Sequence, residues 1–414
     1  MHFEHATLNN GLTVIAETNP RAHSAAIGFF VRTGSRDETP DISGVSHFLE
    51  HMAFKGNDRF SPDDVNRIFD EVGARYNAST SEELTLFYAA VLPEYVARTF
   101  ELLAALLRPS LRDADFDTEK QVILEEIGMY DDMPGFVAHE AAMQTHFSGN
   151  PLGMSILGPS EVIRRLTADQ MREYHVRRYN AGNIVLAAAG RIDMSELLAL
   201  AEEHCSAWPT GVAGRNNAEV APTGGRQFVL RPQSQQQHLM LMAAAPGAAS
   251  PLRYAADVLS IVVGDAQGSR LYWELVDPGH AESADLGFND YDGTGAWVTY
   301  VCCRPEDAQR NLDRIERMYA EILRDGITAE ELEQARNKVA SRIVLQSERP
   351  MGRLSSLGGN WLYRGEYRSV RDDLETLNAV SRDEVRRLLE QYPLTPTTIV
   401  GVGPWEKKVG RGQL

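Results

Sequence analysis

The sequence contains very little cysteine. Among its 414 residues are three cysteines, Cys205, Cys302 and Cys303, and two of them are adjacent. So few cysteines, in an odd number, exclude the disulfide framework that holds small secreted domains together. There is no Cys-x-x-Cys pair either, so a zinc site built from thiolates is not expected.

The chain is also short of positive charge. It has 41 Lys and Arg residues against 58 Asp and Glu residues, which gives a formal net charge of −17. A surface this acidic repels nucleic acid and anionic lipid, so we expect neither as a partner. Two interpretations of the acidity stay open: a well-solvated surface, or an acidic cavity that attracts basic peptides.

Long apolar runs are missing as well. No stretch of about 20 apolar residues occurs, so no membrane span is expected. The opening residues MHFEHATLNNGL lack the basic segment and apolar core of a signal peptide. Together with the cysteine usage, this makes the cytoplasm the default expectation. A periplasmic or organellar form from which a leader has been removed is the alternative.

What the chain does have is the composition of a globular protein and a pattern that repeats. Hydrophobic residues make up 43% and charged residues 24%, which is ordinary globular usage. Each half of the sequence contains two predicted strands, then helices, then one or more further strands. This order predicts an α+β fold of two similar domains, each a mostly antiparallel sheet with helices packed on one face. We expect domains at residues 1–212 and 226–414, joined by a linker at 213–225 that is rich in Gly, Asn and Ala.

One segment near the N-terminus combines a helical pattern with metal-binding side chains. For the segment SHFLEHMAFKG, residues 46–56, either Ser46 or the preceding Ser43 is expected to cap the helix start, and Gly56 is expected to end the helix. His47 and His51 are one turn apart on the same face, where two imidazoles can reach one zinc ion. Glu50 lies beside them, where a base acting on metal-bound water belongs. This H-x-x-E-H order is a zinc peptidase signature, although the same residues also occur on solvated helix faces.

A catalytic zinc site needs a third protein ligand from another element. The predicted helix 117–130 contains three candidates: Glu119, Glu125 and Glu126. Glu119 and Glu126 are seven residues apart and share a helix face, whereas Glu125 lies about 100° away. The residues alone leave the choice open, and they also leave open that all three carboxylates are solvated.

The two segments together resemble a known family. HFLEHMAFKG followed by TEKQVILEEIGMYDD is similar to the pitrilysin, insulysin and mitochondrial processing peptidase family of zinc metallopeptidases, in which a glutamate ligand follows the motif by about 75 residues. Glu126 lies 75 residues after His51. The resemblance implies Zn²⁺ held by His47, His51 and Glu126, Glu50 as general base, and Glu119 as a second carboxylate that orients a ligand imidazole.

The resemblance also implies a binding mode and partners. The stretch 76–91 is similar to the family's edge strand for peptide substrates, and the residues implied in substrate binding are Asn77, Ala78, Ser79, Thr80 and Phe87. Chains of this length resemble half-size members, in which only the first domain carries zinc. Such chains work as homodimers, or as heterodimers with a related inactive chain.

The sequence departs from the family at one place in its second half. The family places an Arg and a Tyr, seven residues apart, after a Ser-Arg-Leu segment, where they help to hold the substrate carbonyl. Here Ser269–Leu271 is present, but the expected pair falls at Val276 and Ser283. Either Arg270 or Tyr272 replaces this pair, or the activity is weak or narrow.

Three functional hypotheses follow. The first is a zinc-dependent endopeptidase that hydrolyses peptides or unfolded polypeptide segments through a metal-activated water. The second is a catalytically weak or inactive partner subunit of a two-chain peptidase assembly, which the missing Arg/Tyr pair favours. The third is a metal hydrolase of another substrate class. The intact H-x-x-E-H motif and Glu126 favour the first.

Overall fold

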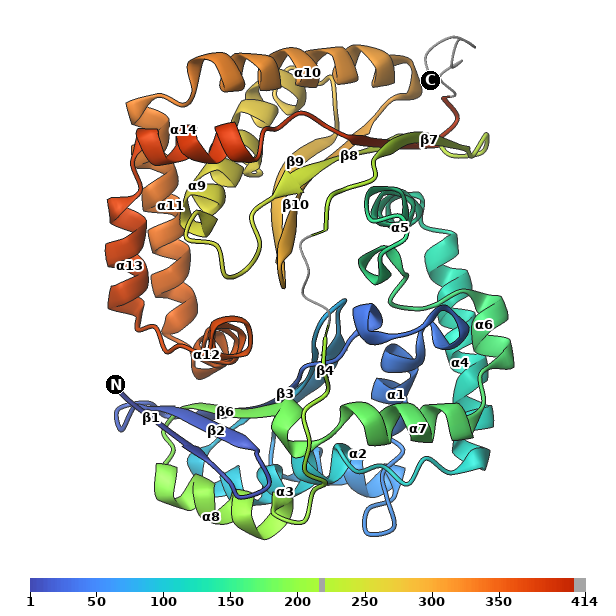
Figure 1. Ribbon diagram of the computed structural model, residues 1–414, viewed down its shortest axis with the longest axis vertical. Helices are drawn as coiled ribbons and strands as arrows, with labels where there is room; N and C mark the ends of the chain where they lie inside the picture. Colours follow the sequence, from blue (N-terminus) through green and yellow to red (C-terminus); the bar gives the residue numbers. More distant parts are fainter. Residues whose placement is uncertain (216–219, 406–414) are drawn as a thin grey trace. The chain divides into compact units, whose positions relative to one another are not determined.

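The computed structural model describes residues 1–215 and 220–405, which form two compact units (Figure 1). The first unit comprises residues 1–127, 154–215 and 343–370, and the second comprises 128–153, 220–342 and 371–405. Each unit has its own sheet and its own helices, which confirms the predicted α+β class.

Each unit includes a segment from the part of the sequence expected for the other domain. These segments are residues 343–370 in the first unit and 128–153 in the second. The domain boundaries at residues 212 and 226 remain a prediction. Residues 216–219 of the predicted linker, and residues 406–414 at the end of the chain, lie outside the described residues.

The sheet of the first unit has six strands in the order β1-β2-β6-β3-β5-β4. The pairing of β2 with β6 is parallel and the other pairings are antiparallel. The strands are β1 (His2–Thr7), β2 (Thr13–Thr18), β3 (Ala25–Val31), β4 (Arg75–Thr80), β5 (Thr85–Val91) and β6 (Ile184–Gly190). β1 and β2 form an antiparallel hairpin, and β6 lies between β2 and β3.

Residues 76–91, predicted as a single strand, form a hairpin instead. They belong to β4 and β5, which are joined by a tight turn in which the Ser81 N–H donates to the Leu84 carbonyl at 2.8 Å. Alternating residues occur on both sides of this turn, so local periodicity does not reveal the reversal. The reversal leaves β4 at the edge of the sheet.

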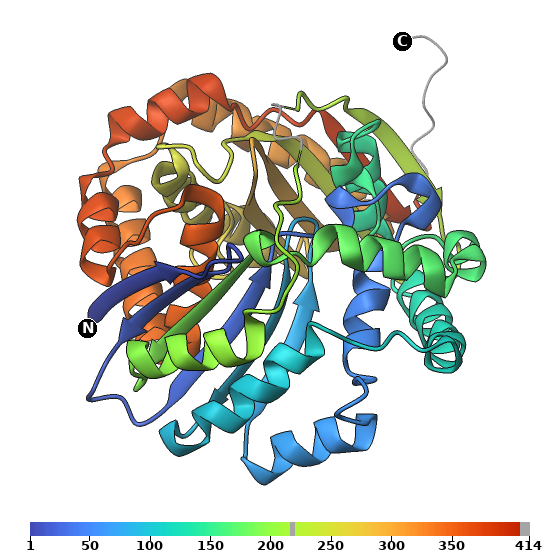
Figure 2. The same ribbon diagram turned by 60° about the horizontal axis from the view of Figure 1, so that its bottom comes forward.

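Helices cover both faces of the first sheet, whereas the sequence predicted helices on one face of each sheet. On one face, the Phe29 ring of β3 lies 5.6 Å from the Phe100 ring of α3, and Figure 2 shows α3 (cyan) and α8 (light green) side by side in front of the strands. On the other face, Leu354 and Leu357 of α12 pack against Phe30. The approach is so close that a Cβ at Gly358 would lie 2.2 Å from the Phe30 ring, so only glycine fits there. The helices that lie wholly or mostly in this unit are α1 (Val45–Ala53), α2 (Pro62–Glu71), α3 (Val96–Leu106), α4 (Asp113–Asp131), α6 (Ser160–Arg165), α7 (Ala168–Arg178), α8 (Met194–Cys205) and α12 (Pro350–Arg364).

The second unit is built on a five-stranded sheet in the order β7-β11-β8-β10-β9. Its strands are β7 (Gly225–Leu230), β8 (Gln237–Ala245), β9 (Ser283–Tyr291), β10 (Thr294–Cys303) and β11 (Thr398–Gly403). β7 pairs with β11 in parallel, and the other pairings are antiparallel.

Helices complete the second unit. Ala138 and Ala142 of α5 pack on Met240, Val298 and Val400 of this sheet. The helices that lie wholly or mostly in the unit are α5 (Pro134–His146), α9 (Arg253–Gly264), α10 (Ala308–Asp325), α11 (Ala329–Ser347), α13 (Val370–Ala379) and α14 (Arg382–Gln391). Across the described part of the chain, no helix has the length and apolar character needed to cross a membrane.

Candidate metal centre

The H-x-x-E-H segment lies on α1, and the helix has the two faces that its sequence predicts. Val45, Phe48, Leu49 and Met52 are buried in the core of the first unit. The start of the helix differs from the prediction. Its N-cap is Gly44, with φ of 93°, and neither Ser43 nor Ser46 caps it. The backbone turns into the helix in a left-handed conformation that favours glycine over serine.

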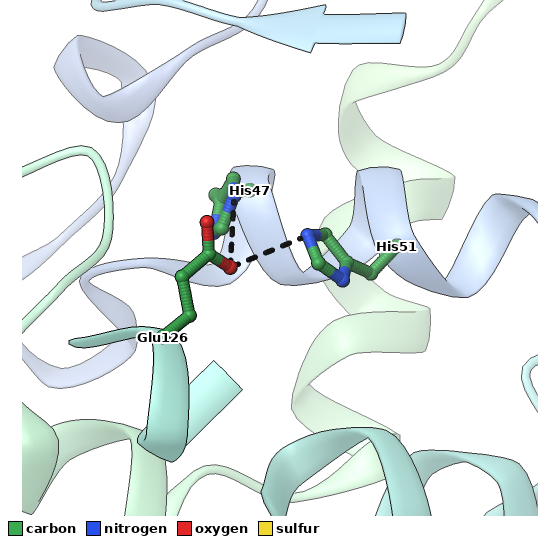
Figure 3. A group of neighbouring side chains, drawn as sticks. All are labelled: His47, His51 and Glu126. Carbon is green, nitrogen blue, oxygen red and sulfur yellow. Dashed lines mark ion pairs between the residues drawn. The ribbon is translucent and has the colours of Figure 1, made fainter. Parts of the chain in front are cut away.

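The side chains of His47 and His51 converge with that of Glu126 from α4 (Figure 3). His47 Nε2 lies 3.8 Å from Glu126 Oε2, and His51 Nε2 lies 3.6 Å from the same oxygen. The three ligand atoms all lie within 4.8 Å of one another. The structure thus brings together the three residues for which the resemblance implied zinc ligation. Glu125, the neighbouring candidate, is exposed.

The spacing and the protonation of these three side chains are suited to a zinc ion. Zinc bonds of 2.0–2.1 Å in a tetrahedral site place the ligand atoms about 3.3 Å apart, which is near the observed 3.6 and 3.8 Å. Burial and the neighbouring His51 lower the pKa of His47 to about 4, so this imidazole is neutral at pH 7. Its Nδ1 is buried and has no hydrogen-bond partner among the described residues, and its Nε2 is too far from Glu126 for a good hydrogen bond. A buried polar ring without partners is unusual, and an ion between Nε2 and Glu126 would supply one.

Glu119 forms a hydrogen bond with the ring nitrogen of His51 that does not face Glu126. His51 Nδ1 lies 2.9 Å from Glu119 Oε1, and Lys55 Nζ lies 2.5 Å from Glu119 Oε2. A proton on Nδ1 leaves the Nε2 lone pair directed at the Glu126 side, which is the arrangement that outer carboxylates give to metal-binding histidines. Burial alone would lower the pKa of His51, but the hydrogen bond with Glu119 and the nearby carboxylates outweigh it and raise that pKa. The hydrogen bond from His51 in turn lowers the pKa of Glu119.

Lys55 was not singled out from the sequence. It lies four residues after His51, just beyond the end of α1, and this spacing is the signal that could have identified it.

Glu50 lies on the same helix and makes a hydrogen bond with the edge strand. The Thr80 hydroxyl donates to Glu50 Oε2 at 2.6 Å. Burial raises the pKa of Glu50, and the Thr80 hydrogen bond opposes this rise. A carboxylate with a raised pKa beside a metal site has the properties of a general base that takes up a proton and then releases it.

The other predicted substrate residues divide between the two sides of β4. Asn77 and Ser79 are exposed, whereas Ala78 is buried on the same side as Thr80. Phe87 is completely buried in the core between β3 and β4. Its side chain has no surface to offer a peptide, so Phe87 takes no part in the function proposed below.

In the second unit, the residues at the positions of the family's Arg/Tyr pair have no matching chemistry. Val276 ends a π-helical turn (Tyr272–Val276), and Ser283 begins β9. Arg270 is held by Glu331, with Nε–Oε1 and Nη2–Oε2 distances of 2.7 and 2.9 Å. Its guanidinium is therefore engaged in a bidentate ion pair.

Two family models match the chain. The model described as "Insulinase (Peptidase family M16)" matches residues 13–160, which include every residue of the candidate metal centre. The model described as "Peptidase M16 inactive domain" matches residues 165–339.

Comparison with known proteins finds relatives along nearly the whole chain. A protein of Mycobacterium leprae named as an uncharacterized zinc protease is 32% identical over 97% of this chain and 92% of its own length. A similarly named zinc protease of Bacillus subtilis is 32% identical over 93% of this chain and 94% of its own length. Among solved structures, a protease from Helicobacter pylori superposes with a TM-score of 0.91 at 20% identity, covering 97% of this chain and 99% of that one. At this identity, the likeness supports the fold alone.

Proposed function

The chain belongs to peptidase family M16, the insulinase family, and from this premise we propose that it is a zinc-dependent endopeptidase that hydrolyses peptides or unfolded polypeptide segments. The observation that carries the proposal is the convergence of His47, His51 and Glu126 beside the carboxylate of Glu50. No other group of His, Cys, Asp or Glu side chains among the described residues has a metal-binding arrangement. The proposal therefore assigns catalysis to the first domain, residues 1–212, and no metal to the second, residues 226–414.

The chemistry divides between the ion and the chain. A bound zinc ion would supply a Lewis acid that activates a water molecule and polarises the scissile carbonyl. His47, His51 and Glu126 would hold it, and Glu119 would keep the His51 ring in its ligating orientation. Glu50 takes a proton from the attacking water and passes it to the leaving amine, for which its raised pKa suits it.

The substrate would bind as an added strand. β4 is an edge strand, and no strand of the described residues pairs with its outer side, which an extended peptide could therefore join. Thr80, the last residue of β4, is bonded to Glu50, so a peptide on this edge would pass close to the proposed base. Backbone pairing selects for extended, unfolded segments more than for particular side chains. Asn77 and Ser79, which are exposed on β4, are the proposed side-chain contacts.

The test combines zinc content with peptide cleavage. We would measure zinc per chain, and the cleavage of a quenched, unstructured basic peptide, for the wild type and for Glu50→Gln. Glu125→Gln serves as a matched control because Glu125 is an exposed glutamate beside a proposed ligand. The expected result is one zinc in all three proteins and loss of cleavage only in Glu50→Gln. Retained cleavage by Glu50→Gln would refute the role of Glu50, and a wild type without zinc would refute the metallopeptidase assignment.

A second candidate function is a weak or inactive partner subunit that pairs with a related chain. Val276 and Ser283 favour it, since neither can hold a carbonyl as Arg and Tyr do, and Arg270 is engaged by Glu331. Loss of one oxyanion donor costs about 100- to 1,000-fold in rate in other hydrolases. Under this alternative the wild type binds zinc but does not cleave the peptide, whereas the endopeptidase proposal expects both. An endopeptidase of this family would itself work as a homodimer or a heterodimer, which the particle mass in solution tests.

A further inference from the structure

Helix α1 has no side-chain cap of its own at its N-terminus. Its N-cap is Gly44, and a larger residue cannot replace it, because a Cβ there would lie 2.4 Å from the Leu157 carbonyl oxygen. The Ser46 hydroxyl does not cap the helix, and it lies 2.7 Å from the Tyr174 hydroxyl, which in turn lies 2.8 Å from the hydroxyl of Thr33. The first N–H groups of the helix that bears the metal-binding motif therefore need a partner from outside the helix.

Glu38 is that partner. Its Oε2 accepts a hydrogen bond from the Gly44 N–H at 2.7 Å, and its Oε1 accepts one from the Ser46 N–H, also at 2.7 Å. The side chain is buried, with 4% of its surface exposed. Both carboxylate oxygens are thus committed to the turn that immediately precedes His47. A negative charge at this helix end is also favoured by the helix dipole.

The segment that bears Glu38 is itself firmly held. The Arg36 guanidinium pairs with the buried carboxylate of Glu83. Asp37 is bridged by Arg178 at 2.8 Å and by Arg215 at 2.5 Å. Glu38 therefore connects α1 to a fixed point in the core of the first unit and not to a loose loop.

The hydrogen bonds from α1 also stabilise the ionised carboxylate of Glu38. Burial raises the pKa of Glu38 to about 8, and the N–H groups of Ser46 and Gly44, together with the Ser46 hydroxyl, act against this rise. An amide in place of the carboxylate has only one acceptor oxygen, so it would face one of the two N–H groups with a donor of its own.

We propose that Glu38 is a positioning residue for the metal centre: its two hydrogen bonds set the position and rotation of α1, and through them the aim of His47 and His51. The inference rests on the proposed function, because it concerns the same metal centre. Glu38 lies nine residues before His47 in the sequence and acts only through the backbone of the helix. A displaced helix would move both imidazoles relative to Glu126, which comes from a different element.

The experiment compares Glu38→Gln with Glu17→Gln. Glu17 is a buried carboxylate of the same unit, bonded at 2.8 and 2.6 Å to Arg353, which lies on α12 and not on α1. Its substitution therefore controls for a general loss of stability. For both variants and the wild type we would measure the zinc dissociation constant by competition with a chromophoric chelator. We would add the absorption spectrum of the cobalt-substituted protein, kcat and KM separately, and amide hydrogen exchange of the metal-free protein.

We expect only Glu38→Gln to alter the centre. Its zinc dissociation constant should rise about tenfold to a hundredfold, as found when supporting groups of metal ligands are removed elsewhere. Its cobalt spectrum should shift, its kcat should fall with little change in KM, and the first amides of α1 should exchange faster. Glu17→Gln should lose stability but keep the zinc affinity and the spectrum of the wild type.

The remaining outcomes separate the inference from the proposed function. If Glu38→Gln binds zinc as the wild type does, or if Glu17→Gln weakens zinc equally, the inference is overturned while the peptidase proposal stands. If the wild type binds zinc but cleaves nothing, the peptidase proposal fails and the zinc affinities still decide the role of Glu38. If the wild type binds no zinc, the peptidase proposal fails, and unchanged hydrogen exchange of α1 in Glu38→Gln overturns the inference as well.

Discussion

The hydroxyl of Thr80 donates a hydrogen bond of 2.6 Å to Oε2 of Glu50. This contact joins the last residue of the edge strand β4 to the helix that bears the metal-binding motif. It orients one oxygen of the carboxylate and opposes the rise that burial causes in its pKa. A hydrogen bond therefore links the strand proposed to bind the substrate directly to the proposed base.

Replacing Thr80 with valine should lower kcat. Valine keeps the shape of threonine but cannot donate a hydrogen bond, so the Glu50 carboxylate loses its orientation. A hydrogen bond to a charged group contributes about 1.5 kcal/mol or more, which corresponds to a loss of about tenfold. Thr80→Ser, which keeps the hydroxyl, is the matched control and should stay near the wild type. Steady-state cleavage of the quenched peptide measures both variants, and equal kcat values for them would contradict the assigned contact.

Replacing Glu119 with glutamine should weaken zinc binding without abolishing it. The amide oxygen can still accept from His51 Nδ1, but the negative charge that favours the ligating form of the ring is lost, and so is the ion pair with Lys55. A dissociation constant about ten- to a hundredfold higher is expected. Competition with a chromophoric chelator gives this constant. Glu125→Gln, on the same helix but exposed, should leave it unchanged, and a comparable effect there would mean that charge alone is responsible.

Peptides that cannot pair along a strand should bind poorly. If the substrate adds to β4, then N-methylation of a peptide nitrogen that faces the strand removes one hydrogen bond. A net contribution of about 1 kcal/mol for each bond predicts a rise in KM of about fivefold. Because neighbouring nitrogens of an extended peptide point in opposite directions, methylating successive positions should give an alternating pattern of KM values. A uniform or absent effect would refute binding as an added strand.

The local features of the candidate site could be predicted from the sequence because they depend on neighbours along the chain. His47, Glu50 and His51 lie within two turns of one helix, so helical periodicity alone places them together. The pairing with Glu126 came from the family's spacing of about 75 residues. The residues alone left open which of Glu119, Glu125 and Glu126 is the third ligand, because no local rule predicts which side chains of two separate helices meet.

The features that were missed depend on contacts between distant segments. The cap of α1 was expected from Ser43 or Ser46, but it comes from Glu38, whose role requires the loop to fold back over the helix end. The β4–β5 reversal was missed because its turn, residues 81–84, contains neither glycine nor proline, the usual turn signals. The packing of α12 on the first sheet involves residues more than 300 positions away from Phe30, a distance that no sequence window covers.

A titration in the second unit should make its stability depend on pH. His146, at the end of α5, is fully buried. Its Nδ1 lies 3.0 Å from the Thr398 hydroxyl, and its Nε2 has no partner among the described residues. Burial lowers the pKa of His146 to about 4, against 6.5 for an ordinary histidine. Between about pH 4 and pH 6.5, His146 is therefore mostly neutral in the folded protein but mostly protonated in the unfolded chain.

The sign of the effect follows from this difference in proton binding. Below about pH 6.5 the unfolded chain binds a proton at His146 that the folded chain does not, so the free energy of unfolding falls as the pH drops towards 4. At pH 5 the loss is on the order of 2 kcal/mol, since one pKa unit corresponds to about 1.4 kcal/mol. His146→Asn can keep the hydrogen bond to Thr398 but cannot titrate, so the difference in its urea unfolding midpoint between pH 7 and pH 5 should be smaller than that of the wild type. His2→Asn, which removes an exposed histidine, should behave as the wild type does. If all three proteins lose the same stability between these pH values, then the buried imidazole of His146 is not the group that titrates.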